Sequence, residues 1–321
     1  MKSNERHFAF CVNDAYARYI AVTIKSIAEN NRGSNNSIHV FTDTVSERNK
    51  KLLNEVVGTY GNCSLHIYEV DDAPLKGLYT GNFTIYTWYR ILIPSVLPES
   101  VERVLYLDAD TLVTDDLGEL FALEMTDKAI AAAPDIQSWL EGAFLRCGYD
   151  SSKGYICAGV LMMNLDYWRR HNLAEKMTGW ALQKRDLIKC PDQDAINYIC
   201  QDSKIILPLR YGFMHCFCEY DMFYGSEYRE ELKACIERPA IIHYNGCAPW
   251  AKECHKHVLH HKWEEYNGML ARPVKRRYMT KGMLKLKTMI WDLVHLYRGR
   301  RKRTLRDVRL RLQNNGSRMM Q

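Results

Sequence analysis

The chain has 321 residues, of which 47% are hydrophobic, so it can bury the core of one large or two small globular domains. Its eleven cysteines are an odd number and no signal peptide is recognisable, which argues against a secreted disulfide scaffold and predicts free thiols in a reducing cytoplasm. Of its 44 basic and 38 acidic residues, 16 and 2 lie in 271–321, which leaves 28 and 36 in 1–270. We therefore expect an acidic body of net charge −8 and a basic tail of net charge +14.

Short apolar runs alternate with amphipathic segments, and this rhythm predicts an α/β sheet. Strands are expected over 7–12, 37–42, 64–70, 104–113, 129–133, 156–165 and 240–244, and helices over 14–30, 46–60, 84–92 and 166–184. No Gly-x-Gly-x-x-Gly follows the first strand, which argues against a dinucleotide-binding fold. In its place Asn13-Asp14-Ala15-Tyr16 offers an amide, a carboxylate and a phenol to a base or ribose.

Two carboxylates, Asp108 and Asp110, interrupt the apolar run 104–113. Burying an ionised Asp costs several kcal/mol unless a cation or hydrogen-bond donors compensate it. In an extended strand, residues two apart point to the same side. Two hard oxygen ligands suit Mg²⁺ or Mn²⁺, which take further ligands from a phosphate. The motif therefore predicts a metal site for a diphosphate substrate, and the alternative is that the two residues end a strand and cap a turn.

Polar side chains also follow other expected strands, at the edge where an open α/β sheet binds ligands. Asp135 comes after the strand 129–133, and His243 ends the apolar run 240–243. A lone His at a strand end is more often structural. Asp192 in Asp192-Gln193-Asp194 is a credible helix cap, although capping does not need three polar residues.

The basic tail, 271–321, mixes bulky apolar residues with its charges, but no apolar run there approaches the roughly 20 residues of a membrane span. An interfacial helix fits better, with Trp291 and Tyr297 at the headgroups and the basic residues on anionic lipid. The alternatives are a solvated tail or a nucleic-acid-binding arm. Because apolar residues interleave the charges, we expect an anionic membrane surface as the partner and no nucleic acid.

Several motifs stand together in a fixed order. They are Asn13-Asp14-Ala15-Tyr16, Arg90, Leu107-Asp108-Ala109-Asp110, Ala158-Gly159-Val160 with Asn164-Leu165, Asp192-Gln193-Asp194, and His243-Tyr244-x-Gly246. This set resembles glycosyltransferase family 8, which includes bacterial lipopolysaccharide galactosyl- and glucosyltransferases and glycogenin. The resemblance covers residues 7 to about 263. It implies a GT-A fold over residues 1–265, with a single mixed central sheet and helices on both faces, followed by a membrane-associating tail over 271–321.

The family resemblance also implies roles for individual residues. Asp108, Asp110 and His243 would hold Mn²⁺ (or Mg²⁺) against the diphosphate of a UDP-hexose. The nucleotide-sugar site would further include Cys11, Asn13, Tyr16, Ala109, Cys157, Ala158, Gly246 and Lys252, and the catalytic group would be Arg90, Asp135, Asp192 and Gln193. Gln193 matches the family's residue below the anomeric carbon. Because an amide is a poor nucleophile, we favour front-face attack through an oxocarbenium-like state, with retention of configuration.

The chain departs from the family pattern at three places. Cys157 stands where Asn is common, and a thiol is a weak hydrogen-bonding group. The usual Lys before Pro249-Trp250 is missing, so Lys252 is only a weak substitute for a phosphate clamp. Asn13 stands where the lipopolysaccharide enzymes often have Asp, although glycogenin-like members share the Asn-Asp-Ala-Tyr form of this chain.

The expected activity is transfer of glucose or galactose from a UDP-sugar to a glycan acceptor. The basic tail favours a lipid-linked acceptor and a cytoplasmic enzyme bound peripherally to the inner face of the cell membrane. Two alternatives remain open: a transferase that glycosylates itself or another protein, and a sugar-nucleotide-binding protein without turnover.

Overall fold

The computed structural model describes residues 5–219, 226–246, 248–251 and 257–275. The chain divides into two compact units, 1–249 with 255–274, and 250–254 with 275–321, and the first unit holds the sheet and its helices. Among the described residues, no helix combines the length and the apolar character needed to span a bilayer. The predicted interfacial helix of the tail and Lys252 lie outside the described residues, and the division at 265–271 stays a prediction.

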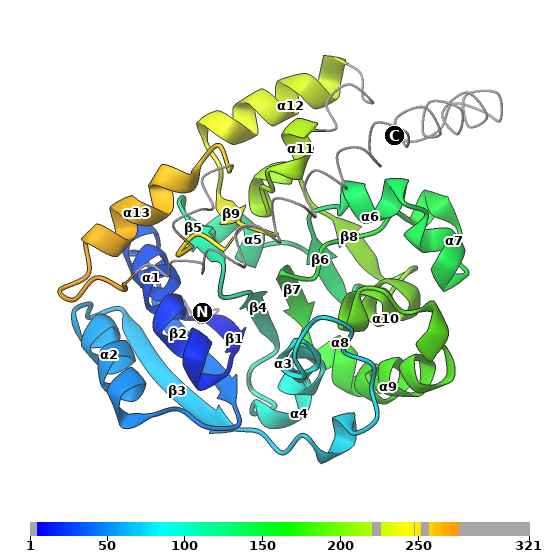
Figure 1. The fold of residues 1–321 in the computed structure, drawn as a ribbon, viewed down its shortest axis with the longest axis horizontal. Coiled ribbons are helices and arrows are strands. Elements are labelled where there is room, and N and C mark those ends of the chain that lie inside the picture. The colour runs from blue at the N-terminus through cyan, green and yellow to red at the C-terminus, as the bar shows by residue number, and fades with distance from the viewer. Residues whose placement is uncertain (1–4, 220–225, 247, 252–256, 276–321) are drawn as a thin grey trace, which may run out of the picture. The chain divides into compact units, whose positions relative to one another are not determined.

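A seven-stranded sheet forms the centre of the first unit, in the order β3-β2-β1-β4-β7-β6-β8 (Figure 1). Its strands are β1 (Glu5–Cys11), β2 (Asn35–Thr42), β3 (Cys63–Glu69), β4 (Arg103–Leu107), β6 (Ile130–Ala132), β7 (Val160–Asn164) and β8 (Lys204–Ile206). Strands β3, β2, β1 and β4 are parallel, β7 runs antiparallel to both neighbours, and β6 pairs in parallel with β8. The predicted mixed α/β sheet is therefore confirmed. A second sheet pairs β5 (Thr111–Val113) with β9 (Ile241–His243).

Most helices are short and connect the strands. The α-helices are α1 (Asp14–Asn30), α2 (Glu47–Gly58), α3 (Tyr86–Tyr89), α4 (Ile93–Val96), α5 (Gly118–Phe121), α6 (Ile136–Leu140), α7 (Ala143–Cys147), α8 (Leu165–Arg170), α9 (Leu173–Gln183), α10 (Pro191–Ile199), α11 (Cys216–Glu219), α12 (Ser226–Glu237) and α13 (His260–Gly268). Single 3₁₀ turns are η1 (Ala73–Leu75), η2 (Arg90–Leu92), η3 (Ser151–Lys153), η4 (Arg185–Leu187) and η5 (Leu209–Tyr211).

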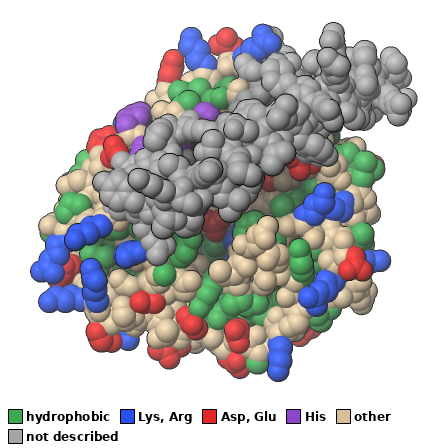
Figure 2. Space-filling view, viewed as in Figure 1, with side chains coloured by type: hydrophobic (Ala, Val, Ile, Leu, Met, Phe, Trp, Pro, Cys, Tyr) green, Lys and Arg blue, Asp and Glu red, His purple; other side chains and the backbone are tan. Residues whose placement is uncertain are grey.

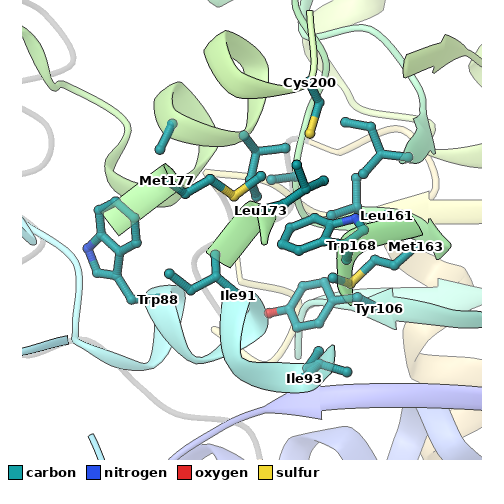
Figure 3. Close-up of a cluster of buried hydrophobic side chains, with 14 of the residues drawn as sticks. Trp88, Ile91, Ile93, Tyr106, Leu161, Met163, Trp168, Leu173, Met177 and Cys200 are labelled. Atoms are coloured by element: carbon teal, nitrogen blue, oxygen red, sulfur yellow. The ribbon is translucent and has the colours of Figure 1, made fainter. Parts of the chain in front are cut away.

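Helices cover both faces of the sheet. On one face, alternate residues of β4 and β7 pair across the strands, with Tyr106 opposite Leu161, and pack against α3, α8 and α9. Figure 3 shows this cluster around Trp88 and Trp168. The indole of Trp168 is buried and donates to the Ala129 carbonyl (3.0 Å), so its polar atom is satisfied in the core. On the opposite face, Phe8 packs edge-on against Phe121 of α5.

Three predicted elements are interrupted, and each break has a local cause. The helix expected over 166–184 is interrupted after Arg170, because Asn172 adopts a left-handed backbone conformation with φ of 50°, and α9 starts after it. The strand expected over 156–165 is paired only from Val160 onward, apart from one bridge at Ile156. The continuous strand over 104–113 was wrong: β4 stops at Leu107 and β5 begins at Thr111.

Candidate active site

The Asp108–Asp110 segment is a tight turn between β4 and β5. The Asp108 amide donates to the Gly159 carbonyl (2.8 Å), and both the amide and the hydroxyl of Thr111 donate to the Asp108 carbonyl (3.2 and 2.8 Å). The two carboxylates therefore converge because the chain turns between them, and not because they alternate along one extended strand. The segment is therefore a turn, as Asp residues favour, and it also brings together atoms that could bind a metal.

Strand β9 brings His243 to this turn. Thr111 is the register partner of His243, and the Tyr244 amide donates to the Asp110 carbonyl (2.9 Å). The His243 Nε2 atom lies 3.3 Å from Asp110 Oδ1 and 3.8 Å from Asp108 Oδ2. One ligand atom from each of the three residues lies within 4.8 Å of the others. Figure 1 shows β9 beside β5, although the two strands lie far apart in the chain.

Two carboxylates and an imidazole form a donor set that suits Mn²⁺ and accepts Mg²⁺. Although burial opposes protonation, the neighbouring Cys157 and Asp110 raise the pKa of the His243 imidazole well above its usual value. A metal ion would have to displace a proton from this side chain, because a ligating imidazole must be neutral.

Gly159 has no side chain at the point where Asp108 and His243 approach each other. A Cβ atom at this position would lie 2.6 Å from Asp108 Oδ2 and 2.8 Å from His243 Nε2, and it would also collide with His243 Cε1. These distances are shorter than van der Waals contact, so a larger residue would push two of the three ligands apart. Glycine at this position therefore allows Asp108 and His243 to approach each other.

Arg90 is a buried cation behind the ligand cluster, with only 4% of its surface exposed. Its Nη2 donates to Asp108 Oδ1 (3.1 Å), and the Tyr106 hydroxyl donates to the same oxygen (2.6 Å). The guanidinium carbon lies 4.2 Å from the centre of the Tyr106 ring, and Nη1 donates to the Ala158 carbonyl. Arg90 therefore fixes the orientation of Asp108 from inside the protein.

Asp192 on α10 has a buried oxygen without a hydrogen bond. Its Oδ2 lies 3.0 Å from Arg90 Nε, but the hydrogen on that nitrogen points to the Thr87 carbonyl. Burial raises the pKa of Asp192 to about 6 and Asp108 adds to the rise, while Arg90 opposes it. An unsatisfied carboxylate oxygen of this kind is costly, and a ligand hydroxyl would satisfy it.

Gln193 is held at both ends of its amide. Its Oε1 accepts from the Ala158 amide (2.9 Å), and its Nε2 donates to Asp135 Oδ2 (2.9 Å). Asp135 in turn caps α6 through the amide and hydroxyl of Ser138 (2.9 and 2.7 Å). The structure therefore brings Asp135, Gln193 and Ala158 together as one fixed group. Asp194, in the same motif, is fully buried and paired with Arg146, so its role is structural.

The residues expected at the nucleotide lie at the end of β1. Asn13 caps α1, and its Oδ1 accepts from the Tyr16 amide (3.0 Å) while the Tyr16 side chain is 43% exposed. Cys11 is buried, and burial raises the pKa of its thiol. Ala109 is partly exposed in the Asp108–Asp110 turn, and Gly246 is exposed with φ of 76°, a conformation that favours glycine. Their nucleotide roles stay predictions.

Two residues of the site were not anticipated from the sequence. Tyr106 orients Asp108, and its position two residues before that Asp in the same apolar run was the available signal. Gly159 was noted only as part of Ala158-Gly159-Val160, and its contact with the ligands depends on the pairing of β4 with β7.

Comparison with known proteins identifies the family to which this chain belongs. The sequence profile described as glycosyl transferase family 8 matches residues 7–254, and the chain belongs to this family. A lipopolysaccharide 1,2-glucosyltransferase of Escherichia coli is 28% identical over 267 residues, which cover 79% of this chain and 73% of that protein. A lipopolysaccharide 1,3-galactosyltransferase of Salmonella typhimurium is 23% identical and covers 81% and 74%.

A solved structure shows the same fold. The galactosyltransferase LgtC, crystallised with donor and acceptor sugar analogs, superposes with a TM-score of 0.73 at 26% identity, covering 83% of this chain and 96% of LgtC. The predicted GT-A-like fold is therefore confirmed, and the chain is a glycosyltransferase of family 8.

Replacing Gly159 with Ala tests the space at the ligand cluster. We expect Mn²⁺ affinity to fall about tenfold or more, because the new Cβ displaces Asp108 and His243. Overpacking should also cost roughly 1–3 kcal/mol of stability. Binding is measured from the electron paramagnetic resonance signal of free Mn²⁺ in the presence of UDP. The matched control is Gly179→Ala in α9, where a Cβ meets nothing within 4 Å. Equal Mn²⁺ affinity in the Gly159 variant and the wild type would contradict the proposed packing.

The raised pKa of Asp192 predicts a pH dependence of stability. Between about pH 4 and pH 6 the folded state holds a proton on Asp192 that the unfolded state has lost, so stability falls as pH rises through this window and is then constant. The loss from this group is at most about 3 kcal/mol. Asp192→Asn should remove this pH dependence, so the free energy of unfolding of the variant should rise relative to that of the wild type between pH 4 and 8. The measurement is urea unfolding. Asp166→Asn, in an exposed ion pair, is the control. A constant difference between variant and wild type across this range would refute the prediction.

Proposed function

We propose that this protein transfers a hexose, glucose or galactose, from a UDP-sugar to a glycan acceptor, with Mn²⁺ or Mg²⁺ and with retention of configuration. The observation that carries the proposal is the convergence of Asp108, Asp110 and His243 at the end of β4. A donor set of this composition is suited to a cation that also binds a diphosphate. The named relatives that act on lipopolysaccharide and the LgtC complex with sugar analogs support the same class of substrates.

The chemistry follows from where each side chain is fixed. A divalent ion, when bound, would stabilise the negative charge that develops on the leaving diphosphate. Asp108 and Asp110 would hold it from one turn, and His243 from β9. Arg90 keeps the Asp108 carboxylate oriented without occupying the open side of the cluster. The metal-site residues therefore bind and position the group that leaves.

The sugar-facing residues would act on the anomeric centre. Gln193 presents an amide whose oxygen already accepts from Ala158, so it is oriented but is a poor nucleophile. Asp192 offers a carboxylate oxygen without a hydrogen bond, which suits a sugar hydroxyl or developing positive charge. This combination supports a front-face reaction through an oxocarbenium-like state over a covalent intermediate.

Asp108→Asn tests the metal-dependent reaction directly. We expect the variant to fold but to lose at least about 100-fold in UDP release, because it loses a charged ligand and an electrostatic stabiliser. The assay measures donor hydrolysis over a panel of UDP-hexoses with Mn²⁺ and with chelator, so no acceptor is needed. Asp166→Asn, an exposed acidic residue on α8, is the charge-matched control. If Asp108→Asn retained turnover that a chelator does not reduce, the proposal would be contradicted.

We further propose that the acceptor is lipid-linked and that the enzyme works in the cytoplasm on the inner membrane surface. The sequence of the tail supports this, because its basic residues alternate with large apolar residues. Figure 2 shows both acidic and basic side chains among the described residues of the face that it draws. By sequence, the net charge is +14 in 271–321 and −8 in 1–270.

Truncation after Lys275 tests the membrane proposal. Val274 is tied to α13, because its amide donates to the Asn267 side chain (2.8 Å) and its carbonyl accepts from it (3.1 Å). A cut after Lys275 leaves both hydrogen bonds in place. We expect the full chain to sediment with vesicles containing anionic lipid and the truncated chain to remain in the supernatant. Unchanged donor hydrolysis would show that the truncated chain is folded. Equal sedimentation of both proteins, or binding of the full chain to nucleic acid without binding to vesicles, would exclude the proposal.

A further inference from the structure

His243 has two ring nitrogens, and they face different groups. Nε2 points toward Asp108 and Asp110, at 3.8 and 3.3 Å. Nδ1 lies 3.6 Å from the Cys157 sulfur, within hydrogen-bonding distance for a thiol. Cys157 is 6% exposed and His243 is 3% exposed, so water has little access to this contact. Among the described residues, Cys157 is the side chain found to pair with Nδ1.

The backbone around Cys157 is held by neighbouring segments. The Cys157 amide donates to the Ala133 carbonyl (3.0 Å), and the flanking Ile156 amide donates to Asn197 Oδ1 (2.8 Å). On the other side, the Ala158 amide donates to Gln193 (2.9 Å). Because three consecutive amides are engaged, the position of the thiol is fixed by the sheet and by α10. The imidazole therefore rests against a rigid partner.

Metal binding decides the tautomer of His243. A metal ion on Nε2 needs the lone pair of that nitrogen, so the ring proton must sit on Nδ1. An N–H on Nδ1 then donates to the Cys157 sulfur. Ligating histidines generally donate their second ring N–H to a neighbouring acceptor, which fixes both the ring orientation and the tautomer.

We propose that Cys157 is a positioning residue for the metal ligand His243, accepting from Nδ1–H so that Nε2 faces Asp108 and Asp110. The proposal rests on the proposed metal site. The competing interpretation is that Cys157 is an inert buried thiol that only fills space, as most buried cysteines do. That interpretation predicts a change in stability on substitution but no change in metal affinity.

Metal binding without turnover separates the two interpretations. Mn²⁺ dissociation constants in the presence of UDP are measured by electron paramagnetic resonance for the wild type, Cys157→Ala, Cys157→Val and Cys157→Ser. We expect the Ala and Val variants to bind about tenfold more weakly, because both lack an acceptor, and Ser to restore part of the affinity. Val fills the space of the thiol with an apolar group that is one heavy atom larger, so it tests the acceptor if Ala fails to fold.

Two controls make the outcomes distinct. Cys200→Ala changes another fully buried cysteine, in the core cluster, and should leave Mn²⁺ affinity unchanged. His243→Ala should lose affinity if the metal site is as proposed. Loss in His243→Ala together with wild-type affinity in Cys157→Ala and Cys157→Val overturns the role of Cys157 alone. Wild-type affinity in His243→Ala overturns the metal site itself, and the role of Cys157 with it.

A spectroscopic measurement reports on the tautomer directly. In the Mg²⁺-loaded wild type with UDP, the ¹⁵N shifts of His243 should show a protonated Nδ1 and an unprotonated Nε2. In the Mg²⁺-loaded Cys157→Val variant, Nδ1–H has lost its acceptor, so its ¹H signal should move upfield and its proton should exchange faster with water. An unchanged Nδ1–H signal and exchange rate in Mg²⁺-loaded Cys157→Val would contradict the positioning role.

Discussion

The compensation of negative charge at the end of β4 is the constraint on which the site depends. The buried cation Arg90 contacts both Asp108 and Asp192 from within, and Asp110 faces His243. One guanidinium and one imidazole do not fully balance three carboxylates where water is only partly present. A divalent cation on the open side would offset the remaining charge. The arrangement of buried side chains therefore favours an ion at the position where a diphosphate would also bind.

The polar groups of the site differ in how many of their hydrogen-bonding atoms have a partner. Gln193, Asp135 and the Ala158 amide satisfy one another, and so they form a rigid frame. Asp192 does not have its full set of hydrogen bonds, although it lies one residue before Gln193 on the same helix. An unsatisfied buried acceptor lowers stability, and functional sites often carry such a cost. Under the proposed function, α10 would orient the site through Gln193 and bind the sugar through Asp192.

Much of the fold followed from local sequence signals, and the exceptions have physical causes. The apolar runs predicted all the strands of the central sheet except the short edge strand β8, and the motif pattern predicted the three metal-capable residues that the structure brings together. The turn at Asp108–Asp110 was mistaken for a strand, because an apolar run does not reveal where the chain bends. The break at Asn172 depends on one left-handed residue, and the partners of Asp192 and Asp194 depend on tertiary contacts with Arg90 and Arg146.

The pairing of β5 with β9 also has a consequence for how the protein matures. Asp108 and Asp110 are made early in translation, whereas His243 follows only after β6, β7, β8 and the helices among them have been synthesised. A contact between segments so far apart forms late in folding, because the loop between them must first be ordered. A nascent or incompletely folded chain thus carries two ligands without the third. Under the proposed function, such a chain would hold a divalent ion only weakly, so metal binding would report that β5 and β9 have paired.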